Sequence, residues 1–204
     1  GMSAMFDYHL ALHGLAIRKT ADAAGIGALV GLDPAVTQKA LDWAEAGRRV
    51  AKAGERYMLT APAQMALRME YSRFYADLRA NAAMLEAYDQ FETINRELKR
   101  LITDWQTIEV GGDRIANDHA NKDYDRRIID RLGSLHERFE PVLKRMAAAL
   151  PRLGIHGELL LAALERAEDG DIRWVSDATI ASYHTVWFEM HEDLLRILGK
   201  VRDE

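Results

Sequence analysis

The sequence contains no cysteine, and its 204 residues include only 4 prolines. The absence of cysteine excludes disulfide bonds, thiolate nucleophiles, iron–sulfur clusters and cysteine-based zinc sites. No stretch reaches the roughly 18 consecutive apolar residues that a membrane-spanning helix needs. No basic segment followed by an apolar core marks a secretory signal. We therefore expect a cytoplasmic protein that does not bind membranes.

The sequence also lacks the short motifs that mark common enzyme classes. It has no Gly-x-Ser-x-Gly segment, no phosphate-binding loop, no Gly-x-Gly-x-x-Gly segment after a strand and no His-Glu-x-x-His. The many Asp and Glu residues follow no spacing that singles out a catalytic pair. The sequence thus predicts a protein that is not an enzyme and that has no cofactor and no metal site.

What the sequence does contain is typical of a globular protein rich in helix. Apolar residues make up 49% and charged residues 29% of the chain, which excludes a disordered tail or a fibre. The formal net charge is −5, which provides no general attraction to nucleic acid. The first 65 residues carry seven Lys or Arg and six Asp or Glu. A nearly neutral front therefore precedes an acidic body.

Local signals in the front part predict two consecutive helices. Thr20 is a suitable N-cap for a helix over residues 21–30. Gly31 suits the position just after that helix, and Asp33 suits the N-cap of the next one, over residues 34–46. The expected apolar face of this second helix has Trp43 beside it and consists of Val36, Ala40, Leu41 and Ala44.

The pattern then changes from helix to strand. Residues 48–60 are typical of a β-hairpin with Gly54 in its turn, and Thr60 and Pro62 begin another helix. Short helices followed by a hairpin within about 60 residues are the layout of a winged helix-turn-helix. We therefore predict a winged helix-turn-helix domain over residues 1–62 and an all-α domain over residues 63–204.

A winged helix of this kind predicts a particular set of DNA contacts. Side chains early on the second helix would contact base edges, and cations on the hairpin would contact phosphates. Acidic side chains on the same helix oppose this interpretation, and many winged domains bind only protein. The predicted DNA-binding residues are Thr37, Gln38, Lys39, Arg48, Arg49, Lys52 and Arg56.

The remainder is compatible with helix except for a loop predicted over residues 109–122. Pro141 is expected to kink or split a long helix over residues 123–150. The terminal helix, over residues 177–201, has an apolar stripe that predicts burial of Trp187 and its neighbours. The segment 62–105 carries more apolar residues than one narrow stripe requires, and it therefore predicts a symmetric homodimer.

Histidines gather in this helical part. His184 and His191 are seven residues apart, so on one helix they lie about 20° apart. Together with the loop before residue 122 they suggest a pocket for a small-molecule effector, whose predicted residues are Asp118, His119, His136, His184, Trp187 and His191. The alternatives are imidazoles that only bond helix ends and neighbouring carboxylates, or a metal site, which needs three or four converging ligands.

Two resemblances accompany these patterns. The first 65 residues resemble the DNA-binding domain of bacterial MarR-like and GntR-like regulators, through Lys19-Thr20-Ala21-Asp22-Ala23, Gly31-Leu32-Asp33-Pro34 and Tyr57-Met58-Leu59-Thr60. The later part is similar to a helical module found beside phosphoenolpyruvate-utilising domains in some bacterial proteins. That similarity is carried by Asp104-Trp105-Gln106, Asn117-Asp118-His119, Tyr124-Asp125, Leu132-Gly133-Ser134-Leu135-His136 and the segment 182–195.

These resemblances imply a DNA-binding transcriptional regulator whose helical part dimerises and senses a small ligand. The alternative is a non-catalytic interaction or regulatory module, related to phosphoenolpyruvate-utilising proteins and without DNA binding. The chain lacks their Gly-Gly-x-x-Ser-His phosphohistidine segment, so the resemblance does not imply phosphotransfer. A third alternative is an enzyme that uses a histidine-rich helical pocket.

Overall fold

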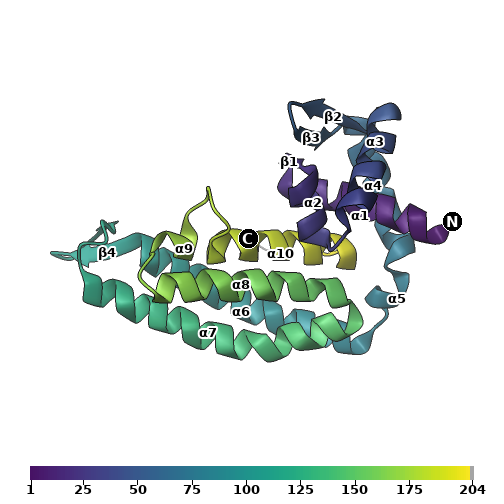
Figure 1. Ribbon diagram of the computed structural model, residues 1–204. Coiled ribbons are helices and arrows are strands. Elements are labelled where there is room, and N and C mark those ends of the chain that lie inside the picture. The colour runs from purple at the N-terminus through teal and green to yellow at the C-terminus, as the bar shows by residue number, and fades with distance from the viewer. Residues whose placement is uncertain (203–204) are drawn as a thin grey trace. The chain divides into compact units, whose positions relative to one another are not determined.

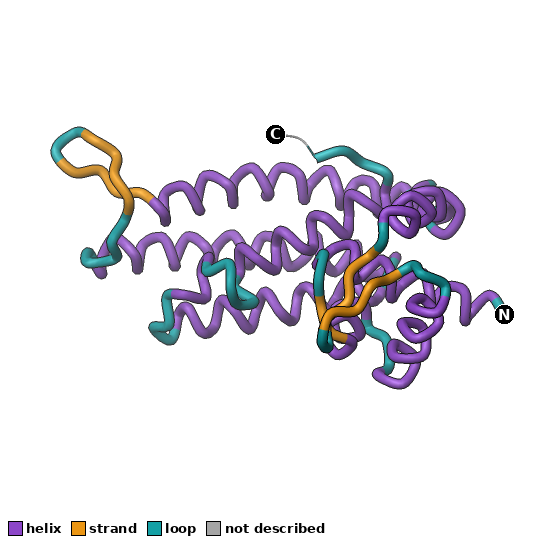
Figure 2. The backbone as a smooth tube through the Cα atoms, turned by 90° about the horizontal axis from the view of Figure 1, so that it is seen from above, coloured by secondary structure: helices purple, strands orange, loops and turns teal. Residues whose placement is uncertain are grey.

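A computed structural model describes residues 1–202, which form two compact units. The first unit comprises residues 1–80 and the C-terminal residues from Glu189, and the second comprises residues 81–188. The described chain has ten α-helices and five short strands (Figures 1 and 2). The predicted mainly α class with a small antiparallel sheet is therefore confirmed.

The first unit combines helices with one small sheet. The last helix of the chain, α10 (Tyr183–Leu198), belongs to this unit from Glu189 onward. The other elements are, in chain order, α1 (Met2–Arg18), β1 (Ala21–Asp22), α2 (Ala23–Val30), α3 (Pro34–Ala46), β2 (Val50–Ala53), β3 (Arg56–Leu59), α4 (Ala61–Phe74) and α5 (Ala76–Arg79). The predicted domain boundary, between residues 62 and 63, lies within α4.

The junction between α2 and α3 follows the local signals of the sequence. Gly31 ends α2 in the left-handed conformation with φ of 75°, and the Asp33 side chain accepts a hydrogen bond from the backbone at the start of α3. The prediction that Thr20 caps a helix over residues 21–30 is wrong. Asp22 caps α2 instead, because its carboxylate accepts from the Gly25 amide at 2.7 Å, which leaves the two preceding residues extended.

Those two extended residues complete the sheet of the first unit. The strand order is β1-β3-β2, and both pairs are antiparallel. Ala21 faces Tyr57 across one pair, and Val50 faces Leu59 across the other. Tyr57 and Val50 are buried, so the hairpin is held on the helices by one face of its strands.

Several apolar side chains of the first unit are exposed where the sequence predicted core. Val36 is exposed and Trp43 is 66% exposed, although both were expected on or beside the apolar face of α3. Ala40, Leu41 and Ala44 do face the core. Because small residues already fill the space between α3 and its neighbours, the Trp43 ring lies outside and packs on Tyr8 at 5.3 Å between ring centroids.

The second unit is a group of helices, in which α6, α7 and α8 lie side by side (Figures 1 and 2). Residues 183–188, the first part of α10, complete it. Its other elements are α6 (Ala82–Gln106), β4 (Thr107–Val110), β5 (Asp113–Ala116), α7 (Lys122–Ala149), a 3₁₀ turn (Pro151–Leu153), α8 (Gly154–Glu168) and α9 (Arg173–Ser176). Asn81 and Asn121 cap α6 and α7 through their side-chain oxygens.

Pro141 does not split α7, which runs unbroken from Lys122 to Ala149. A proline in a helix removes one N–H donor and leaves the carbonyl four residues earlier without its bond. Here Pro141 and Glu137 are both exposed, so water can satisfy that carbonyl. The position of the proline on the solvent side therefore makes it tolerable.

Two other segments of the second unit differ from prediction. Residues 109–122 were expected to be a loop, but β4 and β5 form a hairpin around Gly111 and Gly112, both with positive φ. The terminal helix begins at Tyr183 rather than at residue 177. The Asp177 side chain accepts from the Thr179 amide, and such a local turn competes with helix formation.

Candidate functional site

The predicted DNA-binding residues lie on α3, on the turn after it and on the β2–β3 hairpin of the first unit. Thr37 differs from the others because it is fully buried. Its hydroxyl donates to the Asp33 carbonyl at 2.9 Å, and a Cβ on Gly27 would lie only 2.7 Å from it. Thr37 therefore packs α3 closely against α2. The exposed members of the set are Gln38, Lys39, Arg48, Arg49, Lys52 and Arg56.

Three of the exposed side chains are engaged within the unit. Gln38 donates from its side-chain amide to Asp42 Oδ1 at 2.8 Å and to the Tyr57 hydroxyl at 3.1 Å. The Lys52 ammonium lies 5.4 Å from the centre of the Tyr57 ring. Arg56 donates to the Thr20 carbonyl at 2.8 Å. These contacts join the hairpin to α3 and to the segment before β1.

The other three, Lys39, Arg48 and Arg49, are unneutralised cations. Their side chains form no hydrogen bond or ion pair with any of residues 1–202. Arg48 adopts positive φ, 58°, in the turn that leads from α3 into β2. Free cations at a surface next to a hairpin can contact phosphate oxygens. Asp42 and Glu45 on α3 are also exposed and oppose that attraction.

His119 and Asp118 lie in the turn before α7 in the second unit. Asp125 Oδ2 lies 2.9 Å from His119 Nδ1, and the Asn117 amide donates to the other carboxylate oxygen. The His119 ring packs on Trp105 at 4.6 Å between centroids. Asp118 accepts from the Ala120 amide at 3.0 Å. Both predicted ligand-binding residues therefore have partners that shape the turn.

His136 and Trp187 meet elsewhere in the second unit, around Tyr183. The Tyr183 hydroxyl lies 2.9 Å from His136 Nδ1, and its ring stacks on Trp187 at 6.0 Å between centroids. The Trp187 indole donates to Asn95 Oδ1 at 2.9 Å. Burial lowers the pKa of His136, although the carboxylate of Glu140 acts in the opposite direction.

His184 and His191 share α10 but belong to different units. Burial lowers the pKa of His184, which is partly buried. His191 lies in the first unit, where Arg202 Nη1 lies 3.0 Å from its Nδ1. Within the second unit, the structure brings His136 and Trp187 into one cluster and places His119 in another. An effector pocket formed by the whole set stays a prediction.

Sequence reasoning missed a buried polar cluster in the first unit, around His9 and His13. His9 Nδ1 lies 2.9 Å from Glu70 Oε2 and His9 Nε2 lies 3.0 Å from the Tyr75 hydroxyl. The two imidazole rings stack at 5.9 Å between centroids. The only available signal was their spacing of four residues within an apolar helix, which places both on one face.

The second histidine of this cluster connects α1 to α4 and α10. His13 Nδ1 lies 2.7 Å from the Tyr71 hydroxyl, and His13 Nε2 lies 2.7 Å from Asp193 Oδ1. Burial strongly raises the pKa of the Tyr71 hydroxyl, which keeps it protonated and able to donate. Because the side chains of His13 and Asp193 are almost completely buried, this cluster acts as an internal fastening.

Neither a metal centre nor a membrane span emerges from the described residues. No group of three or more His, Asp or Glu residues among them is arranged to hold a metal ion. No described helix has the length and apolar character to cross a bilayer. The chain matches no family model, no curated protein and no solved structure.

Proposed function

We propose that the first unit contains a winged helix-turn-helix and that the protein is a DNA-binding transcriptional regulator. The observation that supports this most is the order of its elements, α1-β1-α2-α3-β2-β3, together with the antiparallel strand order β1-β3-β2. A winged helix has this arrangement, with its second helix-turn-helix element entering the major groove and its hairpin lying along the backbone.

The contact between α2 and α3 supports this proposal because it fixes the recognition helix. Thr37 of α3 packs against Gly27, where a side chain would collide. The neighbouring residues Gln38 and Lys39 are thereby turned outward. In this proposal they contact base edges, since glutamine pairs with adenine and lysine with guanine.

The hairpin supplies the phosphate contacts. Arg48 and Arg49 have no internal partners, and Lys52 and Arg56 add two more cations on the strands. Such contacts release counterions from DNA, so they give an affinity that falls with salt concentration. Because the chain has a net charge of −5, binding must depend on this local cationic surface.

A homodimer is part of the same proposal. Winged-helix regulators that act as dimers contact two half-sites one DNA turn apart, roughly 34–36 Å. On α4, Met65 and Met69 lie one turn apart and are 68% and 81% exposed. Exposed apolar side chains so close together favour a protein contact. We assign this face of α4 to the dimer interface.

The test is binding of the full chain to a fluorescent duplex made from genomic fragments, measured by anisotropy at several salt concentrations. We expect log affinity to fall linearly with log salt, and Arg49→Gln to reduce the slope by about 1. Lys144→Gln, on the exposed side of α7, makes the same charge change and should leave the slope unaltered. No retardation of any fragment at low salt would contradict the proposal.

One observation favours a second function, a protein-interaction module without a DNA role. Trp43 is 66% exposed on α3, between the exposed carboxylates of Asp42 and Glu45. Exposed tryptophan is typical of protein interfaces, and carboxylates repel phosphate. A protein that fails to bind DNA, but binds a partner through a surface that Trp43→Ala destroys, would have this second function.

A further inference from the structure

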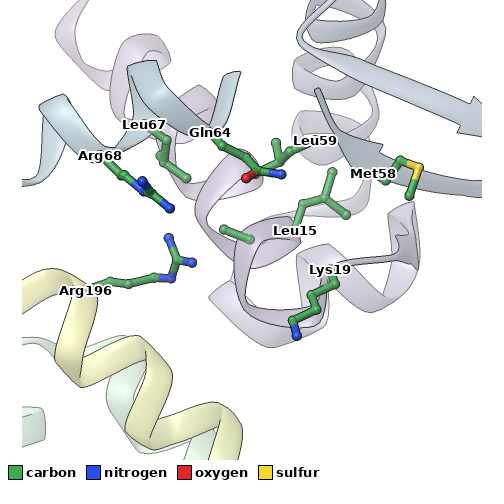
Figure 3. Close-up of a pocket in the computed structure, with 9 residues that line it drawn as sticks. Leu15, Lys19, Met58, Leu59, Gln64, Leu67, Arg68 and Arg196 are labelled. Carbon is green, nitrogen blue, oxygen red and sulfur yellow. The ribbon is translucent and has the colours of Figure 1, made fainter. Parts of the chain in front are cut away.

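A cavity of about 270 Å³ lies in the first unit, between α1, β3, α4 and α10 (Figure 3). Its lining is divided into an apolar part and a charged part. The apolar part includes Leu15, Met58 and Leu67. The charged side chains that line it are all cations, namely Lys19, Arg68 and Arg196.

The charges around this cavity are not balanced by its own walls. No Asp or Glu lines it, and the guanidinium groups of Arg68 and Arg196 point toward one another (Figure 3). The side chains of Lys19 and Arg68 form no hydrogen bond or ion pair with the described residues. Two facing cations repel one another unless an anion lies between them.

Arg196 is held in place by contacts outside the cavity. Its Nε donates to Glu192 Oε2 at 3.1 Å, and its guanidinium also bonds the Tyr71 hydroxyl. These bonds orient one side of the guanidinium on α10. The other side faces Arg68, which comes from α4. The pair therefore resembles a preformed clamp, with one fixed arginine and one exposed, mobile arginine.

We propose that this cavity binds a small organic acid, with its carboxylate between Arg68 and Arg196 and its apolar body against Leu15 and Leu67. Guanidinium groups bind carboxylates through paired, charge-assisted hydrogen bonds. An inorganic anion would leave the apolar wall in contact with water, which favours a ligand with a hydrocarbon part. The volume is just below the roughly 300–1,000 Å³ of typical ligand pockets, so the acid is small. The site does not depend on DNA binding.

The experiment is a titration of the isotopically labelled full chain, followed by backbone amide shifts in NMR spectra. Hexanoate is the probe, hexanamide is its neutral analogue, and acetate and inorganic phosphate are anions without a comparable apolar body. We expect saturable hexanoate shifts at the amides of residues around the cavity, such as Leu15, Lys19 and Arg68. Hexanamide, acetate and phosphate should each bind at least about tenfold more weakly.

A matched pair of variants identifies the clamp. Arg68→Gln removes an exposed cation of the cavity and should weaken hexanoate binding by roughly ten- to a hundredfold. Arg73→Gln makes the same change at an exposed position on the same helix, α4, outside the cavity lining, and should leave the affinity unchanged. Equal binding of hexanoate and hexanamide, or an unaltered affinity in Arg68→Gln, would overturn the proposal. So would shifts that lie away from the cavity.

Discussion

His13 and Asp193 are 180 residues apart in the sequence, yet His13 Nε2 lies 2.7 Å from Asp193 Oδ1. Both side chains are almost completely buried. This contact holds the C-terminal helix α10 to α1 inside the first unit. The same α10 segment carries Arg196, which lines the cationic cavity. The buried contact therefore also positions one wall of the proposed ligand site.

Replacing Asp193 should reveal the strength of this fastening. Asp193→Ala leaves the buried His13 ring without its acceptor, and we expect it to lower the free energy of unfolding by about 3 kcal/mol. Urea denaturation followed by circular dichroism measures this. Asp77→Ala removes an exposed carboxylate of the same unit and should cost less than about 0.5 kcal/mol. Equal costs for the two variants would show that the buried contact is not important for stability.

The two tryptophans Trp187 and Trp43 should respond very differently to the same substitution. Trp187 is 2% exposed and packs among Phe91, Phe139 and Tyr183. Trp187→Ala should therefore cost about 3–5 kcal/mol. Trp43→Ala, at a side chain that is 66% exposed, should cost less than about 1 kcal/mol. The midpoints of urea denaturation compare them, and a small effect of Trp187→Ala would contradict the packing described.

The burial of Trp187 was predictable because its stripe on α10 is continuous. Tyr183, Trp187, Met190 and Leu194 are all buried as predicted, since regular helical spacing alone determines which residues share a face. The start of α3 was predictable for a similar reason, because Asp33 and its neighbours act within a few residues. Signals of this kind depend only on local geometry.

Features that depend on distant partners were not predictable. His9 pairs with Glu70 and His13 with Asp193, and no local pattern links residues so far apart. The position of Trp43 failed for a related reason, because its burial depends on which helix packs against α3. The hairpin around Gly111 was missed although its glycines are typical of a turn, because its strands are only four residues long.

Lowering the pH should destabilise the protein through His136. Burial lowers the pKa of this imidazole below its ordinary value of 6.5, so the unfolded chain binds more protons than the folded chain as the pH falls through 6.5. The contribution to stability is complete above that value and is lost as the pH falls toward the folded-state pKa. Urea midpoints at about pH 7.5 and about pH 5.5 measure this loss.

The matched variant for this pH dependence is His136→Gln, which keeps a polar side chain beside Tyr183 but cannot titrate. Its urea midpoint should fall less between the two pH values than that of the wild type. Burial lowers the pKa of His184 as well, so adding His184→Gln should reduce the dependence further. A wild-type protein that is more stable at the lower pH would contradict the assigned direction.

The proposed dimer predicts a mass of twice 23.0 kDa in sedimentation experiments at micromolar concentration. Met69→Glu places a charge on the exposed face of α4 and should give monomers, because an unpaired charge is costly in an apolar interface. Met2→Glu makes the same change at an exposed residue outside α4 and should leave the dimer intact. A wild-type protein that sediments only at 23.0 kDa would remove the dimer from the proposal.

Lys39 and Arg49 should affect DNA binding in different ways. Lys39 lies on α3 and Arg49 in the turn before β2, and neither side chain has an internal partner. In the proposed complex Lys39 contacts a base edge, so Lys39→Ala should reduce the discrimination between a selected duplex and a scrambled one by about 1–3 kcal/mol. Arg49→Gln removes a phosphate contact and should weaken both duplexes alike.

Gln38 provides the internal comparison for Lys39. Its side-chain amide nitrogen already donates to Asp42 and to the Tyr57 hydroxyl. A base contact by Gln38 must compete with these bonds, so Gln38→Ala should reduce discrimination less than Lys39→Ala does. Competition anisotropy with the selected and scrambled duplexes, at one fixed salt concentration, measures all three variants. If Lys39→Ala weakens both duplexes equally, α3 is not the element that recognises sequence, and the cations of this unit bind only the DNA backbone.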